Sequence, residues 1–296
     1  MSALRIMFTL LLLTFNHAAF AQDEDDREGG IIGTGIVGTI TELGSIYVNE
    51  QHIFIDDALE VTGALGHLTA ADLHPGHVVA VTVHPDGADW RAQSIRQLLT
   101  LVGPVEAVDD TGFTVLGTEV ALGALIPPPH LGDWVAISGL WQNQIVIASR
   151  IDPVHPSYRQ ARISGTYFGP NEEGRNAIGG TAILGLETRH LQPGDLVRAF
   201  GQPTATGIEA TRIEHRLFED AIEVVQIEGY LSPPQPSGLY TVLGSGLVAY
   251  TDRPEMVDSV NRVILCGENG QFEMLQSTSP VPHERKQVRD RLRCAP

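Results

Sequence analysis

The chain has 296 residues, with 36 acidic side chains against 19 basic ones and a formal net charge of −17. Its 31 glycines and 18 prolines exceed ordinary usage, whereas hydrophobic residues, at 43%, are numerous enough for packed cores. The only lysine is Lys286, which excludes a Walker-type phosphate lysine, a Schiff-base lysine and the basic stripe of a duplex-DNA binder. The composition predicts a turn-rich globular β protein.

The N-terminus has the pattern of a cleaved export signal. Arg5 precedes an apolar run at residues 6–15, and Ala19-Phe20-Ala21 is the small-x-small pattern that signal peptidase recognises. We therefore expect a signal peptide at residues 1–21, followed by a disordered acidic leader at residues 22–34. The apolar run is too short to span a bilayer, and no stretch of about 20 apolar residues follows it. These features predict a soluble protein that is periplasmic or secreted.

An opening strand that carries a glycine recurs along the chain at nearly equal intervals. The four glycines are Gly38, Gly103, Gly165 and Gly229. Their period divides the chain into copies at residues 35–100, 101–161 and 162–225 and a divergent fourth copy at residues 226–276. Such a regular period is the signature of a tandem repeat.

Three of the copies continue with the same turn and closing strand. The turn glycines Gly76, Gly132 and Gly194 are expected in left-handed backbone, whereas the fourth copy has residues 257–265 in place of this turn. About five short strands in about 60 residues favour a small closed barrel, because closure removes exposed sheet edges. The sequence predicts an all-β fold of four tandem OB-like β-barrel repeats.

The opening strand, the Leu-x-Pro-Gly-Asp-x-Val turn at residues 191–197 and the closing Ala-x-x-Ile strand recur in this order. Together they resemble the exported bacterial family known as domain of unknown function 5666, over roughly residues 35 to 276. The resemblance implies an extracytoplasmic protein of small β-barrel repeats. It assigns no activity and no catalytic residues.

The C-terminal tail, residues 277–296, is basic and is the best helical candidate. Within it Val288 and Leu292 stand four residues apart, on one face of a predicted short helix at residues 284–293. Cys266 and Cys294 are expected to form a disulfide after export, and two free thiols are the alternative. Closing this loop would contribute on the order of 3 kcal/mol.

Histidines gather in the first copy. His74, His77 and His84 flank one predicted strand, and neutral imidazoles can bind zinc or copper in an oxidising compartment. However, His77 aligns with Asp133 and Asp195 of the next two copies, which favours solvated turn residues. A periplasmic metal-binding protein that uses His74, His77 and His84 is therefore kept as the alternative function.

The sequence offers no motif for catalysis. Residues 33–38 spell the dinucleotide fingerprint G-x-G-x-x-G, but an acidic leader precedes them and a β pattern follows in place of a helix. G-x-S-x-G, H-E-x-x-H and C-x-x-C do not occur. We expect no enzyme activity and no cofactor, and the acidic charge with 6% aromatic residues argues against a nucleic-acid partner.

These observations predict a non-catalytic exported protein of the cell envelope that works by binding or scaffolding. Its partner would be an unidentified protein or small ligand of the envelope.

Overall fold

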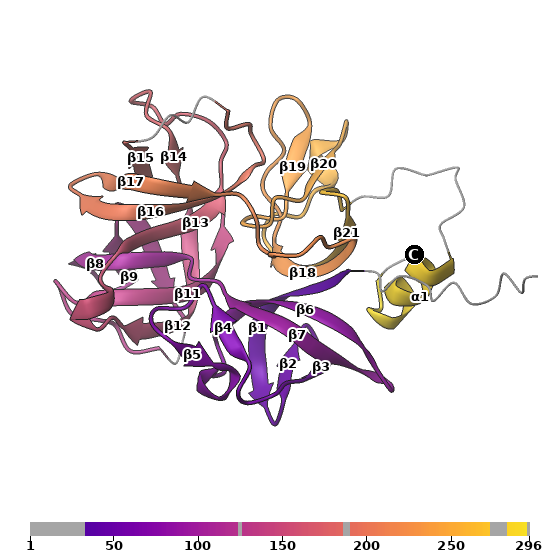
Figure 1. The fold of residues 1–296 in the computed structure, drawn as a ribbon. Helices are drawn as coiled ribbons and strands as arrows, with labels where there is room; N and C mark the ends of the chain where they lie inside the picture. Colours follow the sequence, from indigo (N-terminus) through magenta and orange to yellow (C-terminus); the bar gives the residue numbers. More distant parts are fainter. Residues whose placement is uncertain (1–32, 124–125, 186–189, 273–282, 295–296) are drawn as a thin grey trace, which may run out of the picture. The chain divides into compact units, whose positions relative to one another are not determined.

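The computed structural model describes residues 33–123, 126–185, 190–272 and 283–294. These residues form mostly β strand, with one short α-helix, α1 (His283–Arg291), so the predicted all-β class with a C-terminal helix is confirmed (Figure 1). The predicted signal peptide and nearly all of the acidic leader lie outside the described residues. None of the helices in the described part is long and apolar enough to cross a bilayer.

The first copy is a closed barrel of five strands. The strands are β1 (Thr34–Leu43), β2 (Ile46–Val48), β3 (Gln51–Phe54), β6 (Val78–Asp86) and β7 (Asp89–Gln97). β1 pairs with β2 and β6, and β2 pairs with β3. β7 completes the ring because it runs antiparallel to β6 and parallel to β3. The connection from β3 to β6 adds three short elements: β4 (Glu60–Thr62), β5 (Leu68–Thr69) and the 3₁₀ turn η1 (Ala70–Asp72).

The second copy repeats this connectivity and is also closed. Its strands are β8 (Leu101–Val108), β9 (Gly112–Val115), β10 (Thr118–Leu122), β11 (Trp134–Gln142) and β12 (Ile145–Pro153). The strand order around the ring is first, second, third, fifth, fourth and back to first. A five-stranded Greek-key barrel of this kind is OB-like, as the repeat pattern predicted. The 3₁₀ turn η2 (Pro156–Tyr158) follows it.

The third copy has the same five strands but one weaker junction. The strands are β13 (Ala161–Thr166), β14 (Ala177–Ile178), β15 (Thr181–Leu184), β16 (Leu196–Thr204) and β17 (Gly207–Glu214). β17 again pairs antiparallel with the fourth strand and parallel with the third. Between the first and second strands, an isolated bridge from Pro170 to Asn176 stands in place of a ladder.

The fourth copy contains four strands among the described residues. These are β18 (Val224–Tyr230), β19 (Leu239–Thr241), β20 (Val248–Tyr250) and β21 (Arg262–Glu268), with the 3₁₀ turn η3 (Pro254–Met256) between the last two. β18 pairs with β21, and β19 pairs with β20, as the corresponding strands do in the other copies. Of the four predicted barrels, two are thus closed, the third is nearly closed, and the described residues of the fourth form an open one.

The glycine turns of the first three copies are built alike. Gly76, Gly132 and Gly194 have φ angles of +90°, +84° and +100°, so the predicted left-handed backbone is confirmed. Their amides donate hydrogen bonds of 2.8, 2.9 and 2.8 Å to the end of the opening strand, at the carbonyls of Ile40, Val105 and Tyr167. Each turn therefore fastens the fourth strand to the first.

The copies share cores as well as sheets. β1 pairs in parallel with β18, which joins the first copy to the fourth, and β8 pairs with β13, which joins the second to the third. One buried cluster combines residues of the first, third and fourth copies, including Val78, Leu196 and Ile227. A domain of about 60 residues buries a marginal core by itself, and these shared clusters add to it.

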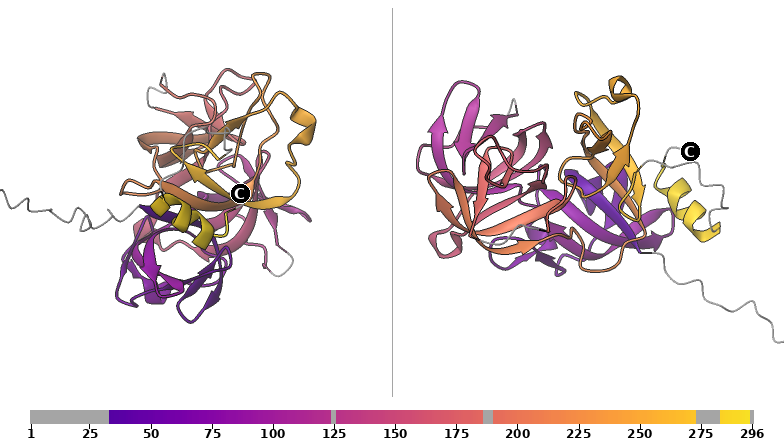
Figure 2. Two further views of the ribbon diagram at one scale, coloured as in Figure 1. Left: turned by 90° about the vertical axis from the view of Figure 1, so that its right-hand side faces the viewer. Right: turned by 90° about the horizontal axis from the view of Figure 1, so that it is seen from above.

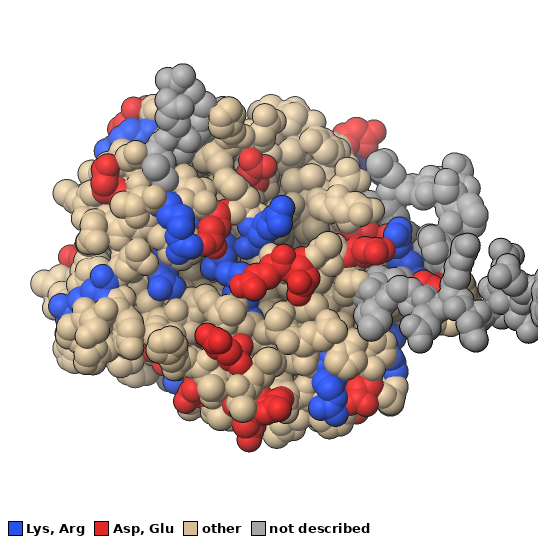
Figure 3. Space-filling view, in the orientation of Figure 1, with Lys and Arg blue, Asp and Glu red and all other residues tan. Residues whose placement is uncertain are grey.

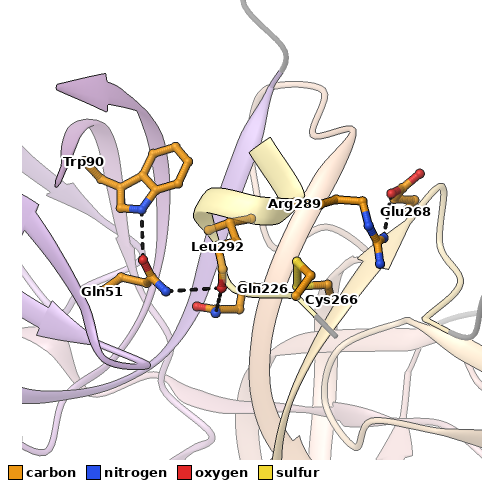
Figure 4. The surroundings of a disulfide bond; sticks show 8 residues. Gln51, Trp90, Gln226, Cys266, Glu268, Arg289 and Leu292 are labelled. Atoms are coloured by element: carbon orange, nitrogen blue, oxygen red, sulfur yellow. Dashed lines mark hydrogen bonds and ion pairs between the residues drawn. A yellow bond between two sulfur atoms is a disulfide. The ribbon is translucent and has the colours of Figure 1, made fainter. Parts of the chain in front are cut away.

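The tail fastens the fourth copy to the first. Cys266 of β21 and Cys294 after α1 are bonded through their sulfurs, so the predicted disulfide is confirmed (Figure 4). The carbonyl of Leu292 accepts hydrogen bonds from Gln51 Nε2 at 3.2 Å and from Gln226 Nε2 at 2.6 Å, and the Leu292 side chain is fully buried in the core of the first copy. Figure 2 shows the yellow helix beside the indigo and orange strands that it connects.

Replacing both Cys266 and Cys294 with serine is expected to lower the free energy of unfolding by about 2–4 kcal/mol, because the disulfide restricts the unfolded chain. Denaturant titration of the oxidised protein and the variant measures the difference. A reductant should lower the stability of the wild type alone. Equal stability of the two proteins under oxidising conditions would contradict the assignment.

Candidate functional site

The fourth copy leaves the position of a fifth strand unfilled among the described residues. In the first three copies this position is taken by β7, β12 and β17, each lying between the third and the fourth strand. In the fourth copy β20 forms its ladder with β19, and β21 forms its ladder with β18. Gln271 forms an isolated parallel β-bridge with Val248 and an isolated antiparallel β-bridge with Glu268. These two bridges have the orientations that a fifth strand has in the other copies, so they mark the place where such a strand would begin.

The three fifth strands share a sequence pattern that the fourth copy lacks. The pattern is an apolar residue, then an alanine two positions later, then an isoleucine three positions after the alanine. It occurs at Trp90-Ala92-Ile95 in β7, at Val146-Ala148-Ile151 in β12 and at Ile208-Ala210-Ile213 in β17. All three strands also carry a register shift against the fourth strand. If Phe272 is the apolar residue of the fourth copy, Met274 and Ser277 replace the alanine and the isoleucine in the sequence.

The open side of the fourth copy contains a cavity of about 720 Å³, compared with about 420 and 440 Å³ for two other pockets of the protein. We call its apolar lining the open face, and it consists of Leu231, Tyr240, Tyr250, Met256, Val257, Leu265 and Phe272. At the base the rings of Tyr240 and Phe272 meet edge to face, with centroids 5.2 Å apart. At the rim Tyr250 is 60% exposed and Met256 is 71% exposed.

The fourth copy holds a large share of the exposed apolar residues. Eight large hydrophobic residues are exposed in the described part of the chain, and four of them, Tyr250, Met256, Val260 and Ile264, belong to the fourth copy. Single exposed hydrophobic residues are ordinary, but Tyr250 and Met256 both line the cavity, and exposed apolar residues grouped at a cavity mark an interaction site. The charges among the lining residues are Asp252 and Arg253, which pair with each other at 3.8 Å.

The chemistry of this site is that of a sheet edge. β20 and β21 present backbone N–H and C=O groups toward the position that a strand occupies in the other copies. An extended segment placed there would gain main-chain hydrogen bonds on both sides and an apolar pocket for alternate side chains. These are the two components of strand addition to an exposed sheet edge.

The three histidines predicted as metal ligands are only partly brought together. The rings of His74 and His77 lie 5.8 Å apart, whereas His84 lies near the opposite end of β6, across from Arg91. In the part of the chain that the structure describes, no three His, Cys, Asp or Glu side chains gather in a way that could hold a metal ion. The geometry therefore adds no support to the metal-binding alternative.

His77 is not the solvated turn residue that its alignment suggested, because it is buried, with 4% exposure. Asp133 and Asp195, at the equivalent position, each accept a hydrogen bond from the amide three residues earlier, at 2.9 and 2.8 Å. In the first copy His77 Nδ1 accepts the same bond at 3.1 Å, so Nε2 carries the proton. Nε2 donates it to Asp152 Oδ2 of the second copy at 3.0 Å.

The open face was not predicted from the sequence, because its residues come from separate strands and turns. Two signals in the sequence pointed toward it. One was the replacement of the glycine turn by residues 257–265, and the other was the loss of the closing alanine and isoleucine after Phe272.

Comparison with known proteins confirms the family resemblance over part of the chain. Residues 102–152 match the family described as Domain of unknown function (DUF5666), and they span the second copy from β8 to β12. No curated protein and no solved structure matches the chain.

The pair of His77 and Asp152 makes stability dependent on pH. Burial raises the pKa of Asp152, but hydrogen bonds and charges from His77 and Arg150 outweigh it and hold this pKa below its usual value of 3.8. The carboxylate therefore stabilises the fold above pH 3.8, and this contribution is lost as the pH falls through the lowered pKa of the folded state.

Asp152→Asn is expected to lower the free energy of unfolding by about 1–3 kcal/mol at neutral pH, because His77 and Arg150 lose their ionised partner. The matched control is Asp89→Asn, whose partner His52 lies 3.3 Å away in a pair with side chains 21% and 40% exposed. Denaturant titrations from pH 7 to 3 measure both variants. If the loss of unfolding free energy caused by Asp152→Asn is as large at pH 3 as at pH 7, the stabilising role of the Asp152 carboxylate is contradicted.

Proposed function

We propose that the protein is an exported binding protein of the cell envelope, without chemistry of its own, and that it takes an extended polypeptide segment into the open face of the fourth copy. The observation that carries this proposal is that no described residue forms a ladder with both β20 and β21, in the place that a fifth strand takes in the other copies. Export rests on the sequence pattern of residues 1–21 and on a disulfide, which is typical of oxidising compartments.

The other copies define how the segment would lie. It would run antiparallel to β21 and parallel to β20, as β17 runs against β16 and β15. In β17 the residues Ile208 and Ala210 point into the barrel and are buried, whereas Glu209 between them is exposed. We therefore expect the ligand to be a segment with alternating apolar residues, belonging to another polypeptide.

Two features hold the site open and ordered. β18 pairs along both of its edges, with β1 on one side and β21 on the other. The disulfide of Cys266 joins β21 to the tail. A receptor strand that is already fixed loses little conformational entropy on binding, so the segment gains more from each hydrogen bond that it forms.

A labelled peptide with the sequence of Gly207–Glu214, followed by fluorescence anisotropy, tests this function on the full chain without its predicted signal peptide. We expect saturable binding, and at least tenfold weaker binding by Met256→Glu, because the bound segment would cover the carboxylate at the rim of the cavity and remove its hydration. The matched control is Leu131→Glu. Leu131 is 69% exposed, almost as much as Met256, but lies in the second copy, so binding should be unchanged.

A second control addresses the main chain. The same peptide with proline in place of Ala210 lacks one N–H of the ladder and should bind more weakly. The proposal is contradicted if neither the original peptide nor a library of extended apolar peptides binds, or if Met256→Glu and Leu131→Glu reduce binding equally. Self-association that Met256→Glu abolishes would identify a second copy of the chain as the occupant, in place of another polypeptide.

A further inference from the structure

Four arginines gather where the first and third copies meet. Arg96 comes from β7, Arg162 from β13, Arg198 from β16 and Arg212 from β17. Phe200 lies among them, with the guanidinium carbons of Arg162, Arg198 and Arg212 at 5.5, 5.6 and 4.0 Å from its ring centroid. Figure 3 shows basic side chains near the middle of this face, with acidic ones among them.

The carboxylates that pair with these arginines are too few to neutralise them. Glu214 forms ion pairs with Arg198 at 2.8 Å, with Arg96 at 4.0 Å and with Arg212. Glu219 pairs with Arg96 at 2.8 Å. Among the described residues, two carboxylates thus face four guanidinium groups. A surplus of two positive charges remains at one place in a protein whose net charge is −17.

Arg162 is the arginine of this cluster whose positive charge lacks a carboxylate partner among the described residues. Its Nη1 donates to the backbone carbonyl of Gly63 at 2.8 Å, and among the described residues it has no carboxylate within ion-pair distance. Its Nε and that of Arg96 are buried without a hydrogen-bond partner. The cluster therefore has more donors than acceptors.

Burial makes this surplus costly. Arg198 has a side chain that is 6% exposed, and burial, followed by the charge of Arg96, lowers its pKa to about 10 despite the nearby Glu214. Like charges held together in a region of low dielectric are unfavourable unless an anion compensates them. Arg212, 56% exposed, and the half-buried Arg162 leave the cluster open to an anion from solution.

We propose that this arginine cluster is a binding site for a phosphate group. A phosphate monoester carries about −1.5 to −2 charges at neutral pH, which matches the surplus, and its oxygens suit the planar fork of arginine. A long polyanion is disfavoured because the rest of the surface is acidic. The group could belong to a small soluble phosphate or to a lipid headgroup, since both offer the same oxyanion.

Isothermal titration with inorganic phosphate, at constant ionic strength, tests the site on the full chain without its predicted signal peptide. We expect one phosphate per chain, and at least tenfold weaker binding by Arg162→Gln. This variant should fold, because it removes one of several like charges held together in a partly buried cluster. The matched control is Arg91→Gln: Arg91 also lies over an aromatic ring, Phe54 at 5.4 Å, and pairs with Asp86 at 2.6 Å, so binding should be unchanged.

A variant with the opposite expected sign completes the test. Glu219 is 62% exposed and pairs with Arg96, so Glu219→Gln raises the surplus and should tighten phosphate binding severalfold. Co-sedimentation with vesicles containing phosphatidic acid, compared with vesicles of phosphatidylcholine alone, distinguishes a lipid headgroup from a soluble phosphate. The proposal is overturned if neither inorganic phosphate nor these vesicles bind, or if Arg162→Gln and Arg91→Gln weaken binding equally.

Discussion

A barrel with this connectivity closes only when its fifth strand pairs with both the third and the fourth. β7 and β12 meet this condition and close the first two copies, and β17 does the same on its side of the third. In the fourth copy the first and fourth strands, β18 and β21, pair in the usual way, but among the described residues no strand lies beyond β21. When no described fifth strand pairs with β20 and β21, one edge of each strand lacks a ladder. The cavity and the exposed apolar side chains at its rim follow from the same absence.

An open barrel of this size needs support from outside itself. β18 lies between β1 and β21, so the sheet of the first copy continues into the fourth. The disulfide to Cys294 and the hydrogen bonds to the Leu292 carbonyl hold the far side of the same sheet. The buried cluster shared by the first, third and fourth copies adds apolar contacts that a single copy could not supply. These contacts support the described strands of the fourth copy even though no described fifth strand pairs with them.

The features that the sequence predicted are local ones. The period, the glycine turns at Gly76, Gly132 and Gly194, and the helix of the tail depend on residues close together in the chain. The disulfide is expected because the sequence predicts export. The contacts between copies could not be predicted in this way. The bond from His77 to Asp152 joins residues of two different copies, and the pairing of β1 with β18 joins the first copy to the last. The four arginines likewise come from strands of two copies, so their proximity is a property of packing rather than of any motif.

Hydrogen exchange of the backbone amides in β21 tests the central claim most directly. β6, the fourth strand of the first copy, pairs along both edges, with β1 and with β7. Its amides therefore serve as the internal reference for slow exchange. We expect the alternate amides of β21 on the edge away from β18, except that of Glu268, which donates to Gln271, to exchange much faster than the amides of β6. They should become protected when the peptide of Gly207–Glu214 binds. Amides of β21 that are as protected as those of β6 in the free protein would contradict the claim, because the fifth position would then already be filled.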